Sequence, residues 1–560
     1  MSTDVTEGSR LLTAEPVVSD PDLAAEPALN GHGHGHLFRG HLLAARVESW
    51  RDPSGSDLFR SKIAVAASAV SLTVMVLASL LLVSFASNSG SVLVANTVWK
   101  PGNYPSWLAG PLGSLTSWAL TPSAHTQRVT LTATVAAMLV AYLVVVFCSR
   151  RLRLGYVVAT VVAVHVIFLL SPPLTLTDVF NYLNYGRMEA VHHLNPYATI
   201  PALEPHSDPT FALSNWHGLL DPYGPLFTLF AMALVPLGVA SSFWAIKVAL
   251  MVASLATVFL VYRCATLLGR NAVAAVAIVG MNPIVLVWGL GGDHNDFLMM
   301  FFLVFAFWLL LRADSMRVGR NARPPSGAQR APLALVRRGW AWLDGMPRPL
   351  VAGEPAAWME ILAGVSLVVA VSIKASSAVL VPVVLAGATR RLRVLAGVLI
   401  GSAAAAAMTY VAFGFNLPNI GQQGSLVVPD GIPNLTGLAL GFGGATAEMR
   451  NVLFVLLIAV IVSMTVWTWR TRRWLTASGW VTLALIVTLS WTLPWYIAWL
   501  LPFAALSRSR VLRVAAAMVG AYMYLVFMPY SSEILAFLHI NPATTTLGQQ
   551  EQTVMNSLLY

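Results

Sequence analysis

The chain has 560 residues, of which 57% are hydrophobic and only 10% are charged, and its mean hydropathy is +0.70. Soluble globular domains carry about 25% charged residues, so this composition excludes that class and indicates an all-α polytopic membrane protein. The net charge of +10 does not indicate a nucleic-acid partner. Most of it is arginine at the ends of apolar segments, as the positive-inside rule predicts.

A polar segment begins the chain, and three apolar spans follow it. Residues 1–60 are rich in Pro, Gly, Ser and charged side chains, which predicts a disordered cytoplasmic tail. The apolar runs at 62–86, 127–148 and 155–171 are each long enough for a membrane helix. The second run ends in the sequence RRLR, which places that end in the cytoplasm. The third span therefore leads outward and delivers Asp178 to the extracytoplasmic side.

A second arginine-rich segment indicates the same topology independently. Residues 312–350 hold eight arginines, which predicts a cytoplasmic loop. The span before this loop then begins outside, where the sequence GGDHND occupies 291–296. The runs 224–240 and 243–262 are both apolar, although the topology requires an odd number of crossings here. The run 224–240 is therefore expected to be tilted or re-entrant, a geometry that is tolerated where protein covers it.

Later apolar segments form two hairpins. Their turns, at Lys374 and at the Pro-Trp-Tyr sequence 494–496, are expected to face outward, as is the loop 415–450. At about 20 residues per span, the chain is expected to hold roughly 12–13 transmembrane helices. The predicted organisation is a membrane core over 61–530 and an extracytoplasmic C-terminal segment over 531–560.

The stretch LTLTDVFNYLNYGR carries the first candidate site. Thr177 is suited to cap a helix whose first turn holds Asp178, and the helix dipole there favours an ionised carboxylate. Asp178, Tyr182, Tyr185 and Glu189 recur at helical spacing and share one face. An ionised, outward-facing carboxylate is suited to act as a base. The alternative is that Asp178 only begins the helix and that the tyrosines belong to an interfacial aromatic belt.

The next outer loop is rich in histidine, acidic and aromatic side chains, which are typical of carbohydrate sites. The alternative is an ordered surface loop whose prolines set its turns. From the Asp178 helix and this loop, the candidates for substrate binding are Tyr182, Tyr185, Arg187, Tyr197, His217, Asp221 and Tyr223. Further candidates in the loop are His192, His193, His206, Asp208 and Trp216.

The sequence GGDHND holds more polar residues than a helix start requires. Only one of Asp293, His294, Asn295 and Asp296 is needed to cap the next helix, so the surplus favours a functional site. Asp and His also suit a divalent ion, but no tight ligand spacing such as HExxH is present. No metal and no other cofactor is therefore predicted.

Lys374 lies among apolar residues, where a lysine costs about 2.5–3.5 kcal/mol at the centre of a membrane helix. A bound anion such as a lipid phosphate would offset that cost. The alternative is a side chain that snorkels to the outer interface without a ligand. Trp495 and Tyr496, at the second outward turn, complete the set of substrate-binding candidates.

Together these features favour a glycosyl transfer at the outer surface. The sequence holds no P-loop and no GxGxxG fingerprint for a nucleotide. The activated donor is therefore expected to be a lipid phosphate that is reached from the membrane. One carboxylate acting as general base, with direct displacement of the phosphate, predicts inversion at the anomeric carbon through an oxocarbenium-like transition state.

Six segments carry a resemblance to a known family. In chain order they are LTDVFNYLNYGR, NPYATIP, DPYGPLF, MNPIVLVWGLGGDHNDFLMM, IKASSAVLVPVVL and TLPWYIAWLLP. The set resembles the actinobacterial polyprenol-phosphate-mannose-dependent α-1,6-mannosyltransferases over residues 60–530. These are GT-C enzymes that elongate the mannan of lipomannan and lipoarabinomannan.

This resemblance implies a GT-C-type bundle in the plasma membrane, with a cytoplasmic N-terminus and an active site at the extracytoplasmic face. It implies a polyprenyl-phosphate mannose donor and a growing α-1,6-mannan or lipomannan-type glycolipid as acceptor. Asp178 matches the family's catalytic base, 294–296 match its HND motif, and Lys374 matches its buried lysine. Asp293 stands where the family has a small residue. The donor sugar and the linkage rest on the resemblance alone.

Two rival functions differ from this one. A transporter or lipid flippase is expected to place ionisable groups in mid-span and to show internal repeats, whereas the polar groups here gather on one side. A GT-C transferase for another sugar, such as arabinofuranose or glucose, is the closer rival. Competition between purified lipid-phosphate donors separates the two transferases.

Overall fold

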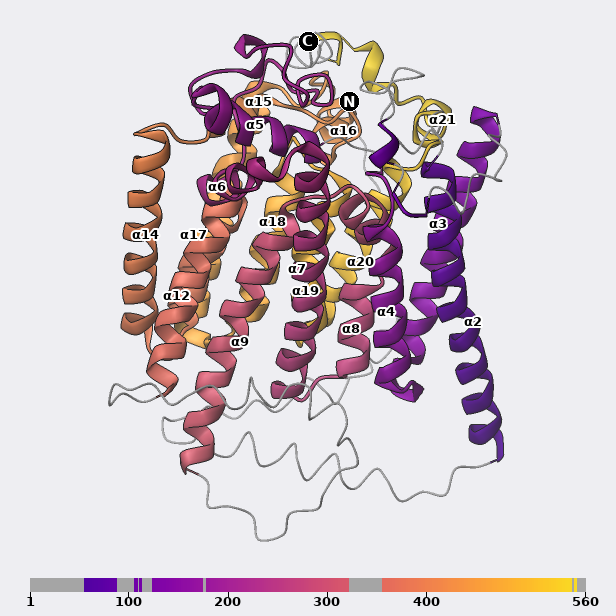
Figure 1. The fold of residues 1–560 in the computed structure, drawn as a ribbon. Coiled ribbons are helices and arrows are strands. Elements are labelled where there is room, and N and C mark those ends of the chain that lie inside the picture. The colour runs from indigo at the N-terminus through magenta and orange to yellow at the C-terminus, as the bar shows by residue number, and fades with distance from the viewer. Residues whose placement is uncertain are drawn as a thin grey trace, which may run out of the picture. The chain divides into compact units, whose positions relative to one another are not determined.

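The computed structural model describes residues 55–87, 105–108, 110–112, 123–174, 178–321, 355–545 and 548–550. Within these ranges the chain forms helices and turns, and no residue lies in a β-strand. Long helices run side by side in a bundle, and shorter helices lie across one of its ends (Figure 1). The all-helical membrane architecture predicted from composition is confirmed.

Seven helices in the described ranges are long and apolar enough to cross a membrane. An eighth span results if α20 (Arg510–Val526) and α21 (Ser531–Phe537), which meet at a bend of 96°, are counted as one. The spans lie in α2 (Gly55–Ala86), α3 (Ala124–Cys148) with η3 (Ser149–Arg151), α7 (Val239–Leu267), α9 (Asp296–Asn321), α12 (Pro355–Ile373), α14 (Arg391–Phe413) and α17 (Ala447–Thr471).

Five further apolar segments have only 10–17 residues each. The expected 12–13 membrane helices match the described set only if these shorter segments are included, since a full span needs about 20 residues. The short segments are α4 (Leu154–Leu169), α6 (Pro225–Leu234) with η5 (Val235–Leu237), η7 (Ala375–Leu380) with α13 (Val381–Gly387), α18 (Trp474–Thr488), and η8 (Pro494–Tyr496) with α19 (Ile497–Leu506).

The segment Pro225–Leu237 agrees with the expectation of a partial crossing. It is too short to cross a hydrocarbon layer of about 30 Å at about 1.5 Å per residue. Pro225 opens the segment at a position where its missing N–H costs no hydrogen bond. Gly238 follows with φ 78° and reverses the chain, and α7 then provides the full-length span.

Polar caps fix several helix boundaries. Ser123 accepts a hydrogen bond from the Thr126 N–H at the start of α3, and Thr446 accepts one from the Met449 N–H at the start of α17. The remaining elements are α5 (Asp178–His192), α8 (Ala272–Gly280), the π-helix η6 (Val285–Leu290), α15 (Ile420–Ser425), α16 (Ile432–Ala439), and the 3-10 turns η2 (Ser106–Leu108), η4 (Pro201–Leu203) and η9 (Pro542–Thr544).

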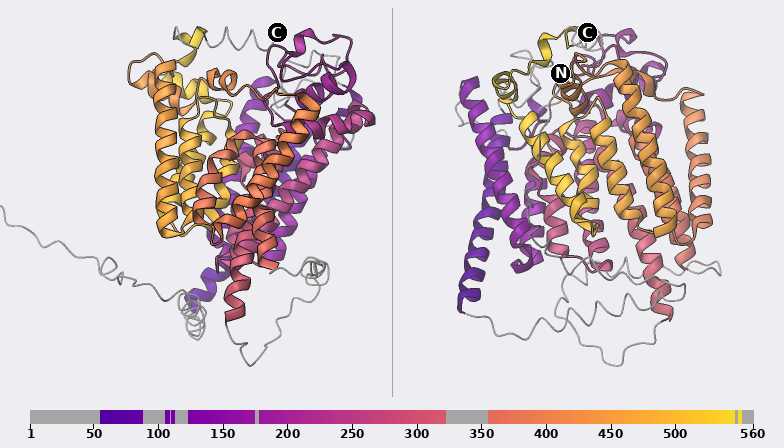
Figure 2. Two further views of the ribbon diagram at one scale, coloured as in Figure 1. Left: turned by 90° about the vertical axis from the view of Figure 1, so that its left-hand side faces the viewer. Right: turned by 180° about the vertical axis from the view of Figure 1, so that it is seen from behind.

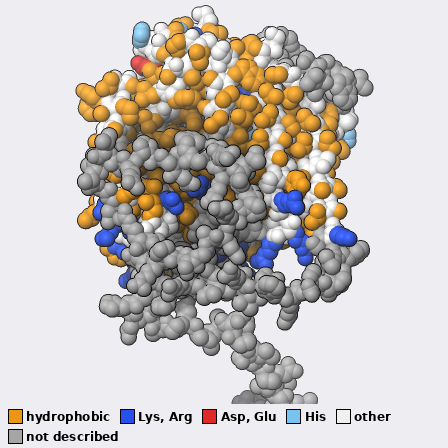
Figure 3. Space-filling model, turned by 60° about the horizontal axis from the view of Figure 1, so that its bottom comes forward, with side chains coloured by type: hydrophobic (Ala, Val, Ile, Leu, Met, Phe, Trp, Pro, Cys, Tyr) orange, Lys and Arg blue, Asp and Glu red, His pale blue; other side chains and the backbone are white. Residues whose placement is uncertain are grey.

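One large apolar core connects most of the bundle. Helix α12 packs extensively on both α9 and α14, α7 packs on α9, and α2 packs on α3. In contrast, α14 and α17 leave most of their apolar side chains exposed, such as Val411 and Val455. Such faces would aggregate in water, so lipid is their natural surrounding. Hydrophobic side chains cover much of the surface in the space-filling view (Figure 3).

The two ends of the bundle differ in character. Helices α5, α15, α16 and α21 lie together at one end, the upper end in Figure 1, and the rotated views agree (Figure 2). Helix α9 begins at that end with Asp296 and carries Arg312 and Arg317 toward the opposite end.

Candidate active site

The candidate site forms where three segments that are distant in sequence meet. Asp178 is the first residue of α5, His294 lies in the turn before α9, and Trp495 lies in η8. The His294 Nδ1 atom is 3.2 Å from Asp178 Oδ2, and the His294 ring stacks on Trp495 with centroids 3.6 Å apart. The Asp178 side chain is 17% exposed, whereas that of His294 is 1% exposed. Thr177, its predicted cap, lies outside the described residues.

A tight turn carries His294 from the π-helix η6 into α9. A Cβ atom on Gly292 would collide with the Trp288 carbonyl and with the His294 ring, so the turn requires glycine there. Asp293 adopts φ 58°, a left-handed conformation that aspartate tolerates better than most residues. The turn therefore holds His294 in one orientation against Asp178.

Asp293 is held by a lysine that the sequence analysis did not single out. Lys247 of α7 donates to both carboxylate oxygens of Asp293 at 2.9 Å, and the two side chains are 0% and 3% exposed. Both charges are thus neutralised inside the protein. Removing one partner of such a pair leaves an unpaired buried charge. We therefore assign Asp293 to the support of the turn.

Asp296 has a second lysine as its partner. The Lys374 Nζ atom donates to both oxygens of Asp296, at 2.8 and 3.0 Å, and Trp499 Nε1 donates to one of them at 2.6 Å. Lys374 also lies over the rings of Tyr496 and Trp499, at 4.8 and 5.4 Å from their centroids. The predicted cost of Lys374 is therefore offset by an internal carboxylate, while its side chain is still 18% exposed.

Lys374 does not lie in the middle of a short hairpin, as the sequence suggested. It follows α12, a full-length span, and its own backbone is extended before η7. At this junction Gly224 donates its N–H to the Ile373 carbonyl at 3.0 Å, and a Cβ on Gly224 would run into the Ser372 carbonyl. The close approach of the segment at Gly224 to the end of α12 fixes the position of Lys374 beside the site.

Aromatic side chains line the Asp178 helix, as its spacing predicted. Tyr182 is buried and meets Tyr223 and Phe227 edge-on, with ring centroids 4.6 and 4.7 Å apart. Its hydroxyl accepts a hydrogen bond from the Asn295 N–H at 3.2 Å, which joins α5 to the turn before α9. Tyr185 is also buried, and its hydroxyl donates to the Leu219 carbonyl at 2.8 Å.

Several carboxylates surround the Tyr182 phenol. Burial raises the pKa of Tyr182 well above its ordinary value, and the charges of Asp178, Asp296 and Asp293 raise it further. Burial likewise raises the pKa of Tyr223, with Asp178 adding to the effect. Both phenols therefore stay protonated at neutral pH and keep a hydroxyl hydrogen beside the acidic cluster.

Polar atoms without partners gather in the same place. His294 Nε2, both side-chain amide atoms of Asn295 and Trp495 Nε1 are buried and lack a hydrogen-bond partner among the described residues. An unpaired buried polar group costs about 1–3 kcal/mol, so each such group calls for a partner. Their concentration around Asp178 is the expected property of a site that pairs them with a ligand or with water.

The candidates in the outer loop are engaged differently. Arg187 donates three hydrogen bonds of 2.9–3.1 Å to Asp208, and His192 Nε2 lies 2.8 Å from the same carboxylate. Thr210 donates its N–H and its hydroxyl to Asp208 at 2.9 and 2.7 Å. Burial opposes ionisation of Asp208, but these bonds outweigh it and hold its pKa well below the ordinary value. The group fastens the loop to α5.

Asp221, Tyr197 and His217 also have partners within the chain. Asp221 accepts hydrogen bonds from the Tyr223 N–H and the Thr228 hydroxyl, and Tyr197 donates to the Tyr223 carbonyl at 3.0 Å. His217 stacks on a phenylalanine ring in its own loop. The structure engages Arg187 and His217 within the outer loop, whereas Tyr197 and Asp221 bond to the backbone of Tyr223, which belongs to the cluster around Asp178. That cluster gathers Tyr182, Tyr185, Tyr223, Asp293, His294, Asn295, Asp296, Lys374, Trp495 and Tyr496.

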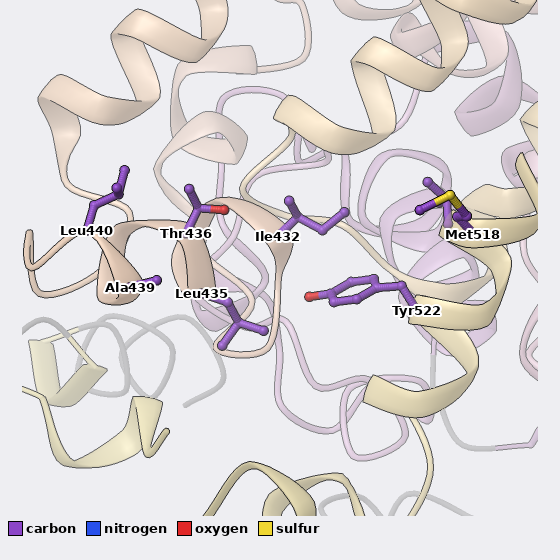
Figure 4. A pocket seen from close by; sticks show the side chains of 8 residues that line it. Ile432, Leu435, Thr436, Ala439, Leu440, Met518 and Tyr522 are labelled. Carbon is purple, nitrogen blue, oxygen red and sulfur yellow. The ribbon is translucent and has the colours of Figure 1, made fainter. Parts of the chain in front are cut away.

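A groove in the described structure lies away from this cluster. It has a volume of about 510 Å³ between α16 and α20 and is lined mainly by apolar side chains, together with Thr436 and Tyr522 (Figure 4). The groove offers no acidic group for chemistry, so it is not the candidate site. No group of three or more His, Cys, Asp or Glu in the described ranges is arranged to hold a metal ion.

Two residues of the cluster were missed by sequence reasoning. Lys247 interrupts an apolar helix and carries the same energetic signal that singled out Lys374. Trp499 lies three and four residues after Tyr496 and Trp495, so helical spacing places it near them. The rule applied to Lys374 would have found Lys247 had it been applied to every span.

Comparison with known proteins matches two parts of the chain to protein families. Residues 85–390 match the family described as alpha-(1->6)-mannopyranosyltransferase, N-terminal domain, and residues 431–547 match a family described as MptB C-terminal domain. Asp178, His294 and Lys374 lie in the first matched part, and Trp495 lies in the second. The stacking of His294 on Trp495 therefore joins the two matched parts.

Two characterised relatives carry the same type of name. Alpha-(1->6)-mannopyranosyltransferase A of Mycobacterium tuberculosis is 26% identical over 395 residues, which cover 67% of this chain and 70% of the relative. The protein of the same name from Corynebacterium glutamicum is 29% identical over 154 residues, 26% of this chain and 30% of the relative. No solved structure matches the chain.

Proposed function

The chain belongs to the alpha-(1->6)-mannopyranosyltransferase family, and from this premise we propose its donor, acceptor and mechanism. We propose that it transfers mannose from a polyprenyl-phosphate donor to a growing α-1,6-mannan or lipomannan-type glycolipid. The reaction takes place at the extracytoplasmic surface of the plasma membrane. The observation that carries the proposal is the partly exposed Asp178 carboxylate inside an otherwise internally paired acidic cluster.

Asp178 is the general base in this proposal. The acceptor hydroxyl attacks the anomeric carbon of the donor while Asp178 takes its proton. The bond between the anomeric carbon and the phosphate oxygen breaks, and its electron pair leaves with the phosphate. General-base assistance of this kind contributes about 10²–10⁴ in rate. Asp293 and Asp296 are unsuited to this role because each is held by a lysine.

A single base implies a single displacement. The attacking hydroxyl enters on the face opposite the leaving phosphate, so the configuration at the anomeric carbon inverts. A β-linked mannosyl phosphate would then give an α-linked product. This outcome agrees with the α-(1→6) linkage in the names of the two relatives.

His294 positions the base. Its ring lies between Trp495, on which it stacks, and the Asp178 carboxylate 3.2 Å away. Gly292 and the Lys247–Asp293 pair hold the turn from which it projects. A carboxylate held in this way is preorganised for proton transfer, which avoids reorganisation during the reaction.

Lys374 is the cation suited to meet the donor phosphate. Lys247 is fully buried, whereas the Lys374 side chain is 18% exposed beside the Tyr496 and Trp499 rings. Phosphate binding would draw its ammonium group partly from Asp296. Positive charge at this position stabilises the negative charge that develops on the leaving phosphate.

The position of the site supports action outside the cytoplasm. Asp296 begins α9 near the cluster, and the arginines of the same helix lie toward its other end. Arginine-rich ends face the cytoplasm as a rule, so the opposite end faces outward. Polyprenyl-phosphate sugars reach such a surface within the membrane, where nucleotide sugars are scarce.

A donor–acceptor assay tests the proposal. Purified protein in lipid vesicles receives radiolabelled polyprenyl-phosphate mannose and a short α-1,6-mannoside acceptor, with polyprenyl-phosphate arabinofuranose and glucose as competitors. We expect transfer of mannose with inversion, and loss of transfer in Asp178→Asn without loss of folding. Unchanged rates in that variant would exclude the assigned base, and transfer of another sugar in preference to mannose would exclude the donor.

A further inference from the structure

A cluster of arginines lies at the end of the bundle opposite the candidate site. Arg390, Arg391, Arg393 and Arg472 line a pocket of about 420 Å³ together with Thr389 and Leu392. The pocket forms where α13 turns into α14 and where α17 ends. Lys and Arg side chains gather at this lower end of the molecule (Figure 3). None of the chemistry assigned above uses these residues.

Hydrogen bonds to backbone carbonyls hold two of the arginines in place. Arg391 donates to the carbonyls of Ala386 and Trp469 at 2.9 and 3.1 Å, and its guanidinium lies 3.3 Å from the Trp469 ring centroid. Arg472 donates to the Ala388 carbonyl at 2.5 Å and has φ 60°. Both guanidinium groups therefore keep fixed positions and retain N–H donors for a further partner.

The neighbouring acids do not neutralise this cluster. Glu360 pairs with Arg317 at 2.6 Å and with Arg393 at 3.4 Å, and Asp314 lies 3.4 Å from Arg317. Within the described part of the chain, no carboxylate pairs with the remaining three arginines of the pocket, which are Arg390, Arg391 and Arg472. Three like charges around one pocket repel one another unless an anion lies between them.

An apolar surface adjoins the pocket on the membrane side. Helix α14 begins at Arg391 and helix α17 ends at Thr471, and both are span-length helices, so the pocket lies at the depth of the lipid headgroups. Leu392 is 80% exposed beside the arginines, and α14 and α17 bury less of their surface than the other spans. An occupant can thus place charge in the pocket and acyl chains on these helices.

From these observations we propose that the pocket binds the phosphate headgroup of an anionic phospholipid. The planar guanidinium fork matches phosphate oxygens in pairs, and basic pockets between membrane helices on the cytoplasmic side suit such headgroups. The acyl chains lie along exposed apolar side chains of α14 and α17. The site is separate from the transferase site and does not depend on the donor or acceptor proposed above.

Lipid titration with matched variants tests the site. The full chain is purified in detergent, and bound lipid is counted by native mass spectrometry during titration with cardiolipin, phosphatidylglycerol or phosphatidylcholine. The pocket variant is Arg390→Gln with Arg472→Gln. The control is Arg470→Gln with Arg473→Gln, which removes the same charge at the same helix end from exposed arginines that do not line the pocket.

We expect anionic lipids to bind wild type on the order of tenfold more tightly than phosphatidylcholine. The pocket variant should lose that preference, and the control should keep it. Equal losses in both variants would show diffuse attraction to surface charge and overturn the proposal. Full displacement by millimolar inorganic phosphate would do the same, because it would identify a free-anion site. The single variant Arg390→Gln, at an exposed residue, serves if the double variant does not fold.

Discussion

Two regions near Asp178 have similar composition but differ in how fully their acidic side chains are paired. The outer loop around Asp208 and the turn around His294 both combine acids, histidines and aromatic rings. In the loop, Asp208 receives bonds from Arg187, His192 and Thr210, and little of its hydrogen-bonding capacity remains. In the cluster, His294 is the one close partner of Asp178 among the described residues, and the Asp178 side chain remains 17% exposed.

This difference separates a structural carboxylate from a candidate catalytic one. A carboxylate that is saturated by internal donors is stabilised as an anion and makes a poor proton acceptor. A carboxylate held by one contact and open on another side can still accept a proton. A carboxylate with few hydrogen-bond partners, near other unpaired buried polar atoms, therefore indicates a catalytic site better than acidic composition does.

The largest expected effect contrasts the two carboxylates directly. Asp178→Asn should lower the rate of mannose transfer by about 10²–10⁴ while thermal unfolding in detergent is unchanged, because only the base is removed. Asp208→Asn should lower the stability by about 3 kcal/mol, because Arg187 loses its partner, while the folded fraction keeps its turnover. Similar losses of turnover in both variants would contradict the assignment of Asp178 as the base and Asp208 as a structural carboxylate.

The buried pair beside His294 should show the next largest effect, on stability. Lys247→Met leaves the Asp293 carboxylate buried without a partner, which should cost about 3–5 kcal/mol. Adding Asp293→Asn removes the unpaired charge and should recover part of that loss. Chemical denaturation of Lys247→Met, of Asp293→Asn and of the double variant measures the coupling energy between the two side chains. Strictly additive losses would contradict a direct pair.

The more open pair should affect binding more than stability. Lys374→Gln removes the partly exposed cation next to Tyr496 and should raise the apparent donor KM about tenfold, equivalent to about 1.4 kcal/mol. Trp499→Phe, which removes another donor to Asp296 but keeps the lysine, is the matched control. Steady-state kinetics at varied concentrations of the lipid-phosphate donor measure this KM. An unchanged donor KM would argue against phosphate binding by Lys374.

The smallest effect concerns a second acid of the outer loop. Burial raises the pKa of Glu204 from 4.5 to about 7, although the Asn184 side chain opposes the rise, and the charge of Asp208 adds to it. The protonated form is therefore favoured by folding. Its stabilisation is complete below pH 4.5 and is lost as the pH rises through about 7.

Glu204→Gln should remove this pH dependence. The wild-type protein should lose on the order of 1–2 kcal/mol between pH 4.5 and pH 8 through this group, and the variant should lose less. Thermal unfolding in detergent at pH 5, 6, 7 and 8 measures the difference. Parallel curves for the two proteins would exclude Glu204 as the titrating group.

Much of the fold followed from local sequence. The expected spans at 62–86, 127–148 and 155–171 correspond to the apolar part Lys62–Ala86 of α2, to α3 and to α4 within a few residues, while α2 itself begins earlier, at Gly55. Hydropathy predicts these boundaries because a membrane helix satisfies its own backbone hydrogen bonds. The short segment Pro225–Leu237 was anticipated only through the count of crossings. The expected count of helices ran higher than the described long helices, since apolar length alone does not separate a span from a short packed helix.

The sequence by itself determined the membrane class, the helical architecture, the family and the polar stretches that contain the candidate site. These properties rest on composition and on short motifs, which are local along the chain. Tertiary structure alone decided which acids are paired, because Lys247 and Asp293 are 46 positions apart, Lys374 and Asp296 are 78 apart, and Trp499 and Asp296 are 203 apart. Pairing over such separations depends on how helices pack, and no local pattern encodes it.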